Sequence, residues 1–227
     1  MNAKIYFHNI LIGTADLQVG DESMGCVFGE FIPNEYYFNN IQKKVWEFWA
    51  NTRPDYIKWY SLRFNVKLDN DFFLFPCGGF TIDDIPELPN EPKRIDIGGI
   101  NLDIFKLKTN SLLEPWSELT IEQKISFEDE LNREITPVKS FFDFVSTRQN
   151  HKLVGAQISA FAKYGPNDDV LFEVIKDGED SRLAVVHLTW ISRKKEHLNH
   201  FPNTHFYLDY NDFEEKRMKP DTLEWNA

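Results

Sequence analysis

Three consecutive runs of β-type sequence, joined only by short turns, constrain the fold of this chain more than any other feature. The runs are GAQISAFAKY (155–164), DVLFEVI (169–175) and RLAVVHLTW (182–190). The connections GPNDD and KDGED are rich in Gly, Pro, Asn and Asp, which is typical of turns. A crossover between parallel strands needs a dozen or more residues, usually a helix. The pattern therefore predicts an antiparallel meander and argues against a doubly wound parallel sheet.

Helical patterns flank this meander. The segment WSELTIEQKISFEDELNREI (116–135) has apolar residues at mostly helical spacing and stops before Pro137. After the meander come a short strand, THFYL (204–208), and an amphipathic segment, YNDFEEKRM (210–218). The second half therefore reads as a helix, a meander of three or four strands, and a helix.

The first half contains a similar set of elements. KIYFHNILI (4–12) and CVFGEFIP (26–33) are β-type, and a helical pattern begins at Asn34, a suitable N-cap, and ends before Pro54. SLRFNVKL (61–68) and FFLFP (72–76) predict a hairpin around the turn at 69–71, and RIDIGGINLDIFKL (94–107) predicts one or two further strands.

These elements predict an α+β protein of two small modules, each a mostly antiparallel sheet with one or two packed helices. A boundary within 108–116 separates two complete sets of elements. We assign residues 1–110 to the first module and 111–227 to the second.

Composition narrows the class of partner. The formal net charge is −11, and both halves have more acidic than basic side chains. This charge repels nucleic acid and anionic membranes and favours a basic protein partner. No apolar run approaches the length of a membrane span, and the N-terminus reads as a strand rather than a signal peptide. The only two cysteines, Cys26 and Cys77, lie in no zinc-binding spacing. Free thiols in the cytoplasm are the simpler interpretation.

The histidines raise the question of an enzyme. His197, His200 and His205 lie within nine residues, but their spacings of three and five match no established zinc motif, and Pro202 separates the last of them. We interpret the cluster as a polar loop and expect no metal or other cofactor. His187 lies inside the predicted strand at 182–190. It could act as a general base, but a half-buried structural histidine with one satisfied ring nitrogen is the more common case.

Two other segments have alternative interpretations. GDESMG (20–25) resembles a nucleophile elbow but places Gly20 one residue too far from Ser23, and a strand-like segment follows it. The aromatic segment WEFWANTRPDYIKWY (46–60) could form an exposed binding face. Packing of these rings into the core is the favoured alternative.

Several segments carry a resemblance to a known kind of protein. NDDVLFEV, RLAVVHLTW and FPNTHFYLDYNDF, together with GDESMGCVFGEFIP and FFLFPCGGFTIDDIPELPNEPKRIDI, resemble small bacterial proteins encoded near polymorphic toxin genes. The resemblance covers about two thirds of the chain and implies an immunity-type protein. It assigns no catalytic or binding residue. The charged loop SRKKEHLNH (192–200) departs from the pattern.

We therefore expect a cytoplasmic immunity or inhibitor protein that occludes a cognate toxin, such as a basic nuclease, through an acidic surface. The candidate contacts are acidic residues expected in exposed turns: Asp21, Glu22, Asp83, Asp84, Asp168, Asp169, Glu179, Asp180, Glu214 and Glu215. The alternative is a small metal- or histidine-dependent hydrolase that uses His187 or the group His197, His200 and His205. A structural or regulatory interaction module is a third possibility.

Overall fold

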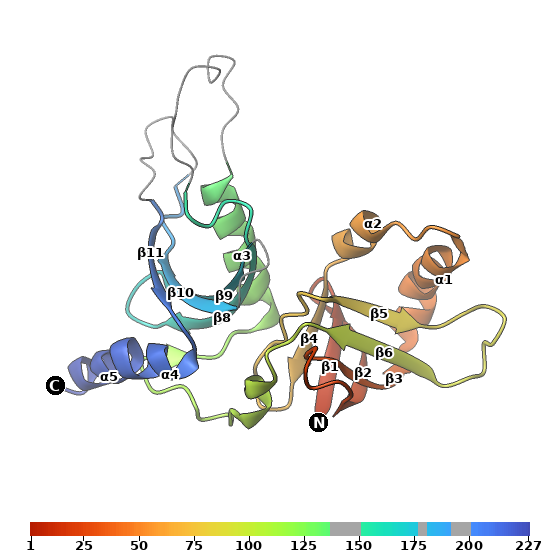
Figure 1. Cartoon of the computed structure of the whole chain (residues 1–227), viewed down its shortest axis with the longest axis horizontal. Helices are drawn as coiled ribbons and strands as arrows, with labels where there is room; N and C mark the ends of the chain where they lie inside the picture. Colours follow the sequence, from red (N-terminus) through yellow and green to blue (C-terminus); the bar gives the residue numbers. More distant parts are fainter. Residues whose placement is uncertain (137–150, 177–180, 192–200) are drawn as a thin grey trace, which may run out of the picture. The chain divides into compact units, whose positions relative to one another are not determined.

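The computed structural model describes residues 1–136, 151–176, 181–191 and 201–227. It is an α+β structure with two compact units, Met1–Thr109 and Asn110–Ala227, each containing one antiparallel sheet (Figure 1). The predicted α+β class is confirmed. The predicted boundary lies one residue from the observed division. Within the described part of the chain, no helix has an apolar stretch long enough to cross a bilayer.

The first unit contains a six-stranded sheet with the order β4-β1-β2-β3-β6-β5. Its strands are β1 (Asn2–Phe7), β2 (Ile10–Val19), β3 (Val27–Pro33), β4 (Phe64–Leu68), β5 (Gly79–Asp83) and β6 (Lys93–Gly98). A two-residue turn of His8 and Asn9 joins β1 to β2, and His8 has a positive φ of 55°. Such tight turns match the twist of the strands that they join.

Two helical segments lie against this sheet. The π-helix η1 (Tyr37–Ile41) leads into α1 (Gln42–Ala50), and α2 (Tyr56–Ser61) follows. The predicted cap is present, because Asn34 Oδ1 accepts a hydrogen bond from the Tyr37 amide at 3.1 Å. The indoles of Trp49 and Trp59 donate to the carbonyls of Ile82 and Phe80, which attaches both helices to β5 (Figure 1).

One detail of this unit differs from the sequence-based expectation of a hairpin. The arm FFLFP forms no full strand, because only the bridge between Lys67 and Phe73 and a few neighbouring hydrogen bonds pair it with β4. The segment 94–107 supplies one strand, β6, and then the 3₁₀ helix η2 (Leu102–Lys106). Asn101 caps η2 by accepting from the Asp103 amide at 3.0 Å.

The second unit contains a five-stranded sheet with the order β11-β10-β9-β8-β7. Its strands are β7 (Trp116–Ser117), β8 (Gln157–Tyr164), β9 (Asp169–Ile175), β10 (Arg182–His187) and β11 (Asn203–Tyr207). The predicted antiparallel meander is confirmed. A bulge between Ala160 and Ala162 interrupts the regular alternation of side chains between the two faces of β8, so Phe161 is buried with both neighbours.

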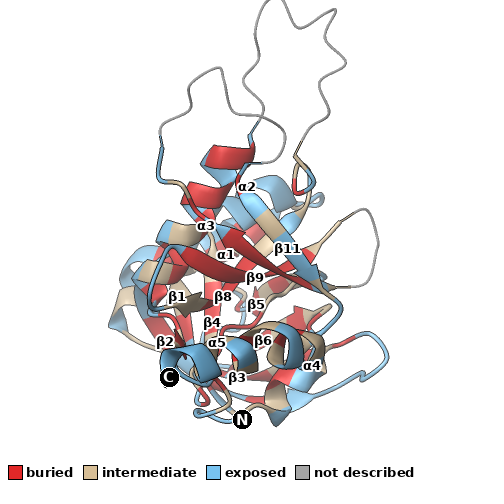
Figure 2. Ribbon diagram, turned by 90° about the vertical axis from the view of Figure 1, so that its left-hand side faces the viewer, coloured by how far each residue is buried: buried red, intermediate tan, exposed pale blue. Residues whose placement is uncertain are grey.

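Helices cover this sheet and bury its central strand. α3 (Ile121–Ile135) lies against β8 and begins with a capping box formed by Thr120 and Gln123. The C-terminal segment comprises α4 (Tyr210–Phe213), the π-helix η4 (Glu214–Met218) and α5 (Lys219–Trp225). The Phe213 ring contacts Trp116 of β7 and Tyr207 of β11, at centroid distances of 5.0 and 5.6 Å. As Figure 2 shows, β9 is buried along almost its whole length.

Candidate functional site

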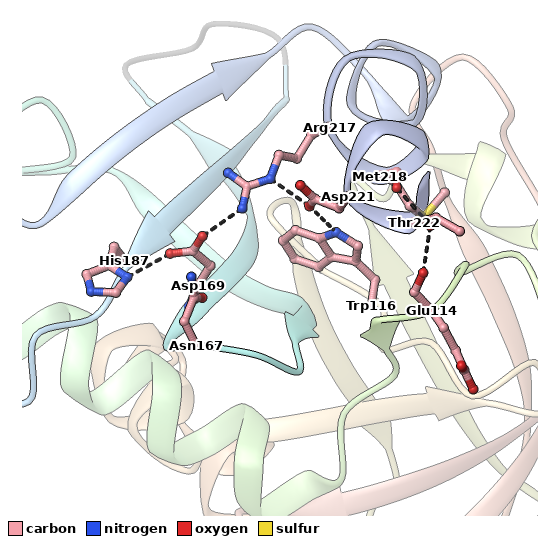
Figure 3. Close-up of polar contacts among 9 residues, drawn as sticks. All are labelled: Glu114, Trp116, Asn167, Asp169, His187, Arg217, Met218, Asp221 and Thr222. Carbon is pink, nitrogen blue, oxygen red and sulfur yellow. Dashed lines mark hydrogen bonds and ion pairs between the residues drawn. The ribbon is translucent and has the colours of Figure 1, made fainter. Parts of the chain in front are cut away.

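A chain of charged side chains connects β9, β10 and the C-terminal helices (Figure 3). Antiparallel pairing places His187 at the end of β10 opposite Asp169 at the start of β9. The distance from His187 Nδ1 to Asp169 Oδ1 is 2.8 Å, and Arg217 Nη2 donates to Asp169 Oδ2 at 2.8 Å. Asp169 therefore bridges an imidazole and a guanidinium.

The Arg217 guanidinium has further partners. Its Nε atom donates to Asp221 Oδ2 at 2.7 Å, and the Trp116 indole donates to the same oxygen at 2.7 Å (Figure 3). The guanidinium also lies 5.7 and 5.4 Å from the ring centroids of Trp116 and Tyr164. Burial lowers the pKa of Arg217, but its bonds to Asp221 and Asp169 outweigh burial and raise it above the usual value. This arrangement stabilises the packing of η4 and α5 on the sheet.

His187 and Asp169 form an imidazole–carboxylate pair of the kind that orients a general base. The His187 side chain is 48% exposed, and its second ring nitrogen has no hydrogen bond to a described residue. Among the described residues, His187 has no hydrogen bond to a serine, threonine or cysteine side chain, which an activated nucleophile would provide. Arg217 also neutralises the Asp169 carboxylate, which weakens its effect on the imidazole.

The histidine cluster lies partly outside the described residues. His197 and His200 belong to segment 192–200, and His205 is exposed on β11 opposite Val185. Within the described ranges, no three or more His, Cys, Asp or Glu side chains gather in a way that could hold a metal ion.

The predicted acidic contacts separate into exposed and buried residues. Asp21, Glu22, Asp83, Asp168 and Glu215 are exposed, and Glu214 is half-buried. Glu179 and Asp180 lie outside the described residues. The prediction of exposure was wrong for Asp84 and Asp169, which are 3% and 7% exposed. Neighbouring residues on an extended backbone point to opposite sides. In the pair Asp83–Asp84 only Asp83 faces solvent, and in the pair Asp168–Asp169 only Asp168 does.

Asp21 organises the exposed turn in which it lies. Its Oδ1 atom accepts from the Ser23 hydroxyl at 2.6 Å and from the amides of Ser23 and Met24 at 2.9 and 3.2 Å. The Ser23 hydroxyl makes the largest contribution to lowering the pKa of Asp21. The carboxylate therefore stays charged at the surface.

Asp84 instead forms the centre of a buried network. Its carboxylate accepts from Tyr37 Oη at 2.7 Å, Gln42 Nε2 at 3.0 Å and Trp46 Nε1 at 3.1 Å. Lys93 Nζ lies 3.4 Å away. Burial, and then the bond to Asp84, raise the pKa of Tyr37 above its usual value. This network attaches η1 and α1 to the end of β5.

The two helices that this network supports present an aromatic surface. α1 and α2 enclose a hollow of about 90 Å³, enough for a few atoms, since a water molecule occupies about 30 Å³ in the liquid. Its lining is mixed: Lys44, Glu47, Phe48, Asn51, Asp55, Lys58, Trp59 and Leu62. On α2, beside this hollow, the residues Tyr56, Ile57 and Tyr60 are 50%, 86% and 57% exposed. We call the hollow and these three residues the α2 surface.

The geometry of α2 explains this exposure, which the sequence offered only as the alternative to core packing. Successive helical residues are rotated by roughly 100°, so Ile57 points away from Trp59. Trp59 is buried, and its ring packs against Phe48 in a tilted arrangement at a centroid distance of 4.3 Å, which turns Ile57 to solvent. The favoured expectation of core packing therefore holds for Phe48 and Trp59 but not for Tyr56 and Tyr60. The Asp55 cap beside Pro54 was the available signal for this helix.

The fold and these surfaces define a class: an α+β protein of two antiparallel-sheet units, with exposed aromatic residues beside a small hollow in the first unit. Comparison with protein-family models, with curated proteins and with solved structures found no match.

Proposed function

We propose that this chain is an immunity-type inhibitor that binds a cognate toxin domain and blocks its site by occlusion. The α2 surface is the observation that carries the proposal. Tyrosine is among the residues that dominate protein–protein binding energies, especially beside pockets that a partner can fill. Ile57, at 86% exposure, is an apolar side chain that such a partner would cover.

The α2 surface has a rigid support. The Trp59 indole donates to the Phe80 carbonyl of β5 at 2.6 Å, and Asp55 Oδ1 accepts from the Lys58 amide at 3.0 Å. Little conformational entropy is then lost when a partner binds, because the helix is already held in place. The rings of Tyr56 and Tyr60 pack near each other, with centroids 6.2 Å apart.

Charge supplies the second part of the proposal. A chain with net charge −11 accelerates its association with a basic toxin such as a nuclease. The exposed carboxylates Asp21, Glu22, Asp83 and Asp168 contribute to this long-range attraction. Under this proposal the chain acts in the cytoplasm, where the thiols of its two cysteines, Cys26 and Cys77, stay reduced.

Co-expression with the product of the adjacent gene tests the proposal. We expect the chain to rescue growth and to co-purify with that product. Ile57→Ala combined with Tyr60→Ala should weaken binding at least tenfold. Ile32→Ala, at a 63% exposed position on β3, is the matched control and should change binding less than twofold. Failure of the wild-type chain to rescue growth or to co-purify would refute inhibition, and equal binding by the two variants would refute the α2 surface.

The His187–Asp169 pair favours a second candidate function, a histidine-dependent hydrolase. Hydrolysis of nitrophenyl esters, measured with and without added Zn²⁺, tests it. A hydrolase that uses this pair should lose activity in His187→Ala and retain it in His205→Ala. If the chain shows no hydrolysis above buffer, or if both variants match the wild type, this alternative is rejected.

A further inference from the structure

An exposed tryptophan with an unusual backbone conformation follows β10. Trp190 is 42% exposed and has a positive φ of 55°. A bulky side chain rarely adopts this left-handed region, which favours glycine and asparagine. The conformation aims the indole in a direction that a regular strand end would not provide, so the surrounding structure must hold it there.

A buried carboxylate holds this turn. Glu134 Oε1 on α3 accepts from the Thr189 amide at 2.7 Å, the Thr189 hydroxyl at 2.9 Å and the Trp190 amide at 2.9 Å. Glu134 itself is only 8% exposed. Bonds of this kind to a charged acceptor are stronger than neutral ones, and together they offset the cost of the left-handed residue.

The indole lies beside an exposed carboxylate. Trp190 Nε1 donates to Asp168 Oδ1 at 3.0 Å, and the Trp190 ring contacts Phe127 of α3 edge-on at a centroid distance of 6.1 Å. Asp168 is exposed, and its Oδ2 atom has no hydrogen bond to a described residue. An aromatic face and a carboxylate oxygen are therefore presented side by side.

We propose that Trp190 and Asp168 form a binding site for an arginine side chain of a basic protein partner. The inference rests on the proposed function, since it names the chemistry that the toxin would present to this unit. A guanidinium stacks on an indole face through cation–π attraction and donates to a neighbouring carboxylate through its planar set of N–H groups. Lysine is a poorer fit, because its ammonium group neither stacks nor presents a planar pair of donors.

Nuclear magnetic resonance of the indole N–H groups in the whole chain tests the site without a toxin. The Trp190 signal is identified by its absence from Trp190→Phe. Titration with N-acetyl-arginine methylamide should shift this signal saturably in the millimolar range. The citrulline analogue, which has the same shape without the charge, should shift it at least fivefold less, and the lysine analogue should be intermediate. An equal shift with citrulline, or none with arginine, would overturn the inference.

Two variants separate recognition from folding. Asp168→Asn removes the charge at an exposed position and should reduce the arginine response at least threefold while the spectrum elsewhere stays unchanged. Trp190→Gly suits the positive φ, so the chain should remain folded, and it should lose co-purification with a toxin at least tenfold. Unchanged behaviour of both variants overturns the site. If the wild-type chain co-purifies with the adjacent gene product but shows no arginine response, only this inference fails. If it shows the response without co-purifying, only the inhibitor proposal fails.

Discussion

Asp84→Asn tests the buried network that supports the α2 surface. The substitution keeps the size of the side chain and removes its negative charge. The Asp84 side chain is 0% exposed and receives hydrogen bonds from three side chains, of which the Tyr37 hydroxyl is the closest at 2.7 Å. Lys93, whose side chain is 8% exposed, would lose its carboxylate partner. An amide offers one acceptor oxygen in place of two, so at least one buried donor is left unsatisfied.

The expected loss of stability follows from these contacts. Breaking a buried ion pair by removing one partner costs about 3–5 kcal/mol. The lower end applies here, because Lys93 Nζ retains hydrogen bonds to the carbonyls of Pro89 and Glu91 at 3.0 and 3.2 Å. A loss of about 3 kcal/mol corresponds to a fall of about 1–2 M in the midpoint of urea unfolding.

Hydrogen exchange and urea unfolding together measure this effect. Amides of η1 and α1 should exchange faster in Asp84→Asn, while those of α3 should not change. Asp83→Asn is the matched control, because Asp83 is the exposed neighbour and its loss should cost no more than about 0.5 kcal/mol. Adding Lys93→Met to Asp84→Asn should restore part of the lost stability, since the unpaired charge is then gone. Equal stability of Asp83→Asn and Asp84→Asn would refute this account of the network.

Three further predictions concern the second unit. Burial raises the pKa of Glu173 from 4.5 to about 7, so the folded state binds the proton more tightly. The free energy of unfolding should therefore fall by up to about 3 kcal/mol as pH rises from 4.5 through 7. Urea unfolding at a series of pH values measures this fall, and Glu173→Gln should remove most of it. Thr120→Ala removes half of the capping box and should lower the free energy of unfolding by about 1 kcal/mol. Ser126→Ala, on the exposed side of α3, is the control and should cost less; thermal unfolding of both variants measures the difference. Arg217→Met leaves Asp169 without its guanidinium and should cost about 2–4 kcal/mol, with faster amide exchange in η4 and α5; an unchanged exchange pattern would contradict the bridging role.

Much of the second unit could be predicted because its signals are local. Few residues separate β8 from β9 and β9 from β10, which leaves no room for a crossover, so the antiparallel meander follows from sequence spacing. In the first unit, the Asn34 cap could be predicted for the same reason, since its acceptor oxygen reaches an amide only three residues away. The helix α2 was missed because its six residues, Tyr56–Ser61, are too few for apolar spacing to distinguish a helix from a strand.

The candidate site was less predictable, and the acidic pairs show why. Asp83–Asp84 and Asp168–Asp169 look alike in sequence, yet each pair has one exposed and one buried carboxylate. Which member is buried depends on whether the strand and its neighbours bring donors to it. The exposure of Ile57 also depends on Trp59 finding the Phe80 carbonyl as a partner. These outcomes are set by packing, which periodicity alone does not specify.

By itself, the amino-acid sequence determined the features that depend on residues close along the chain: strand alternation, turns, helix caps and the antiparallel class. Only the tertiary structure decided how the buried charges are satisfied. Tyr37 reaches Asp84 across 47 positions, Arg217 reaches Asp169 across 48, and Glu134 holds Trp190 across 56. A carboxylate is stable in the interior only where donors surround it. Those donors come from distant segments that meet only in the folded chain.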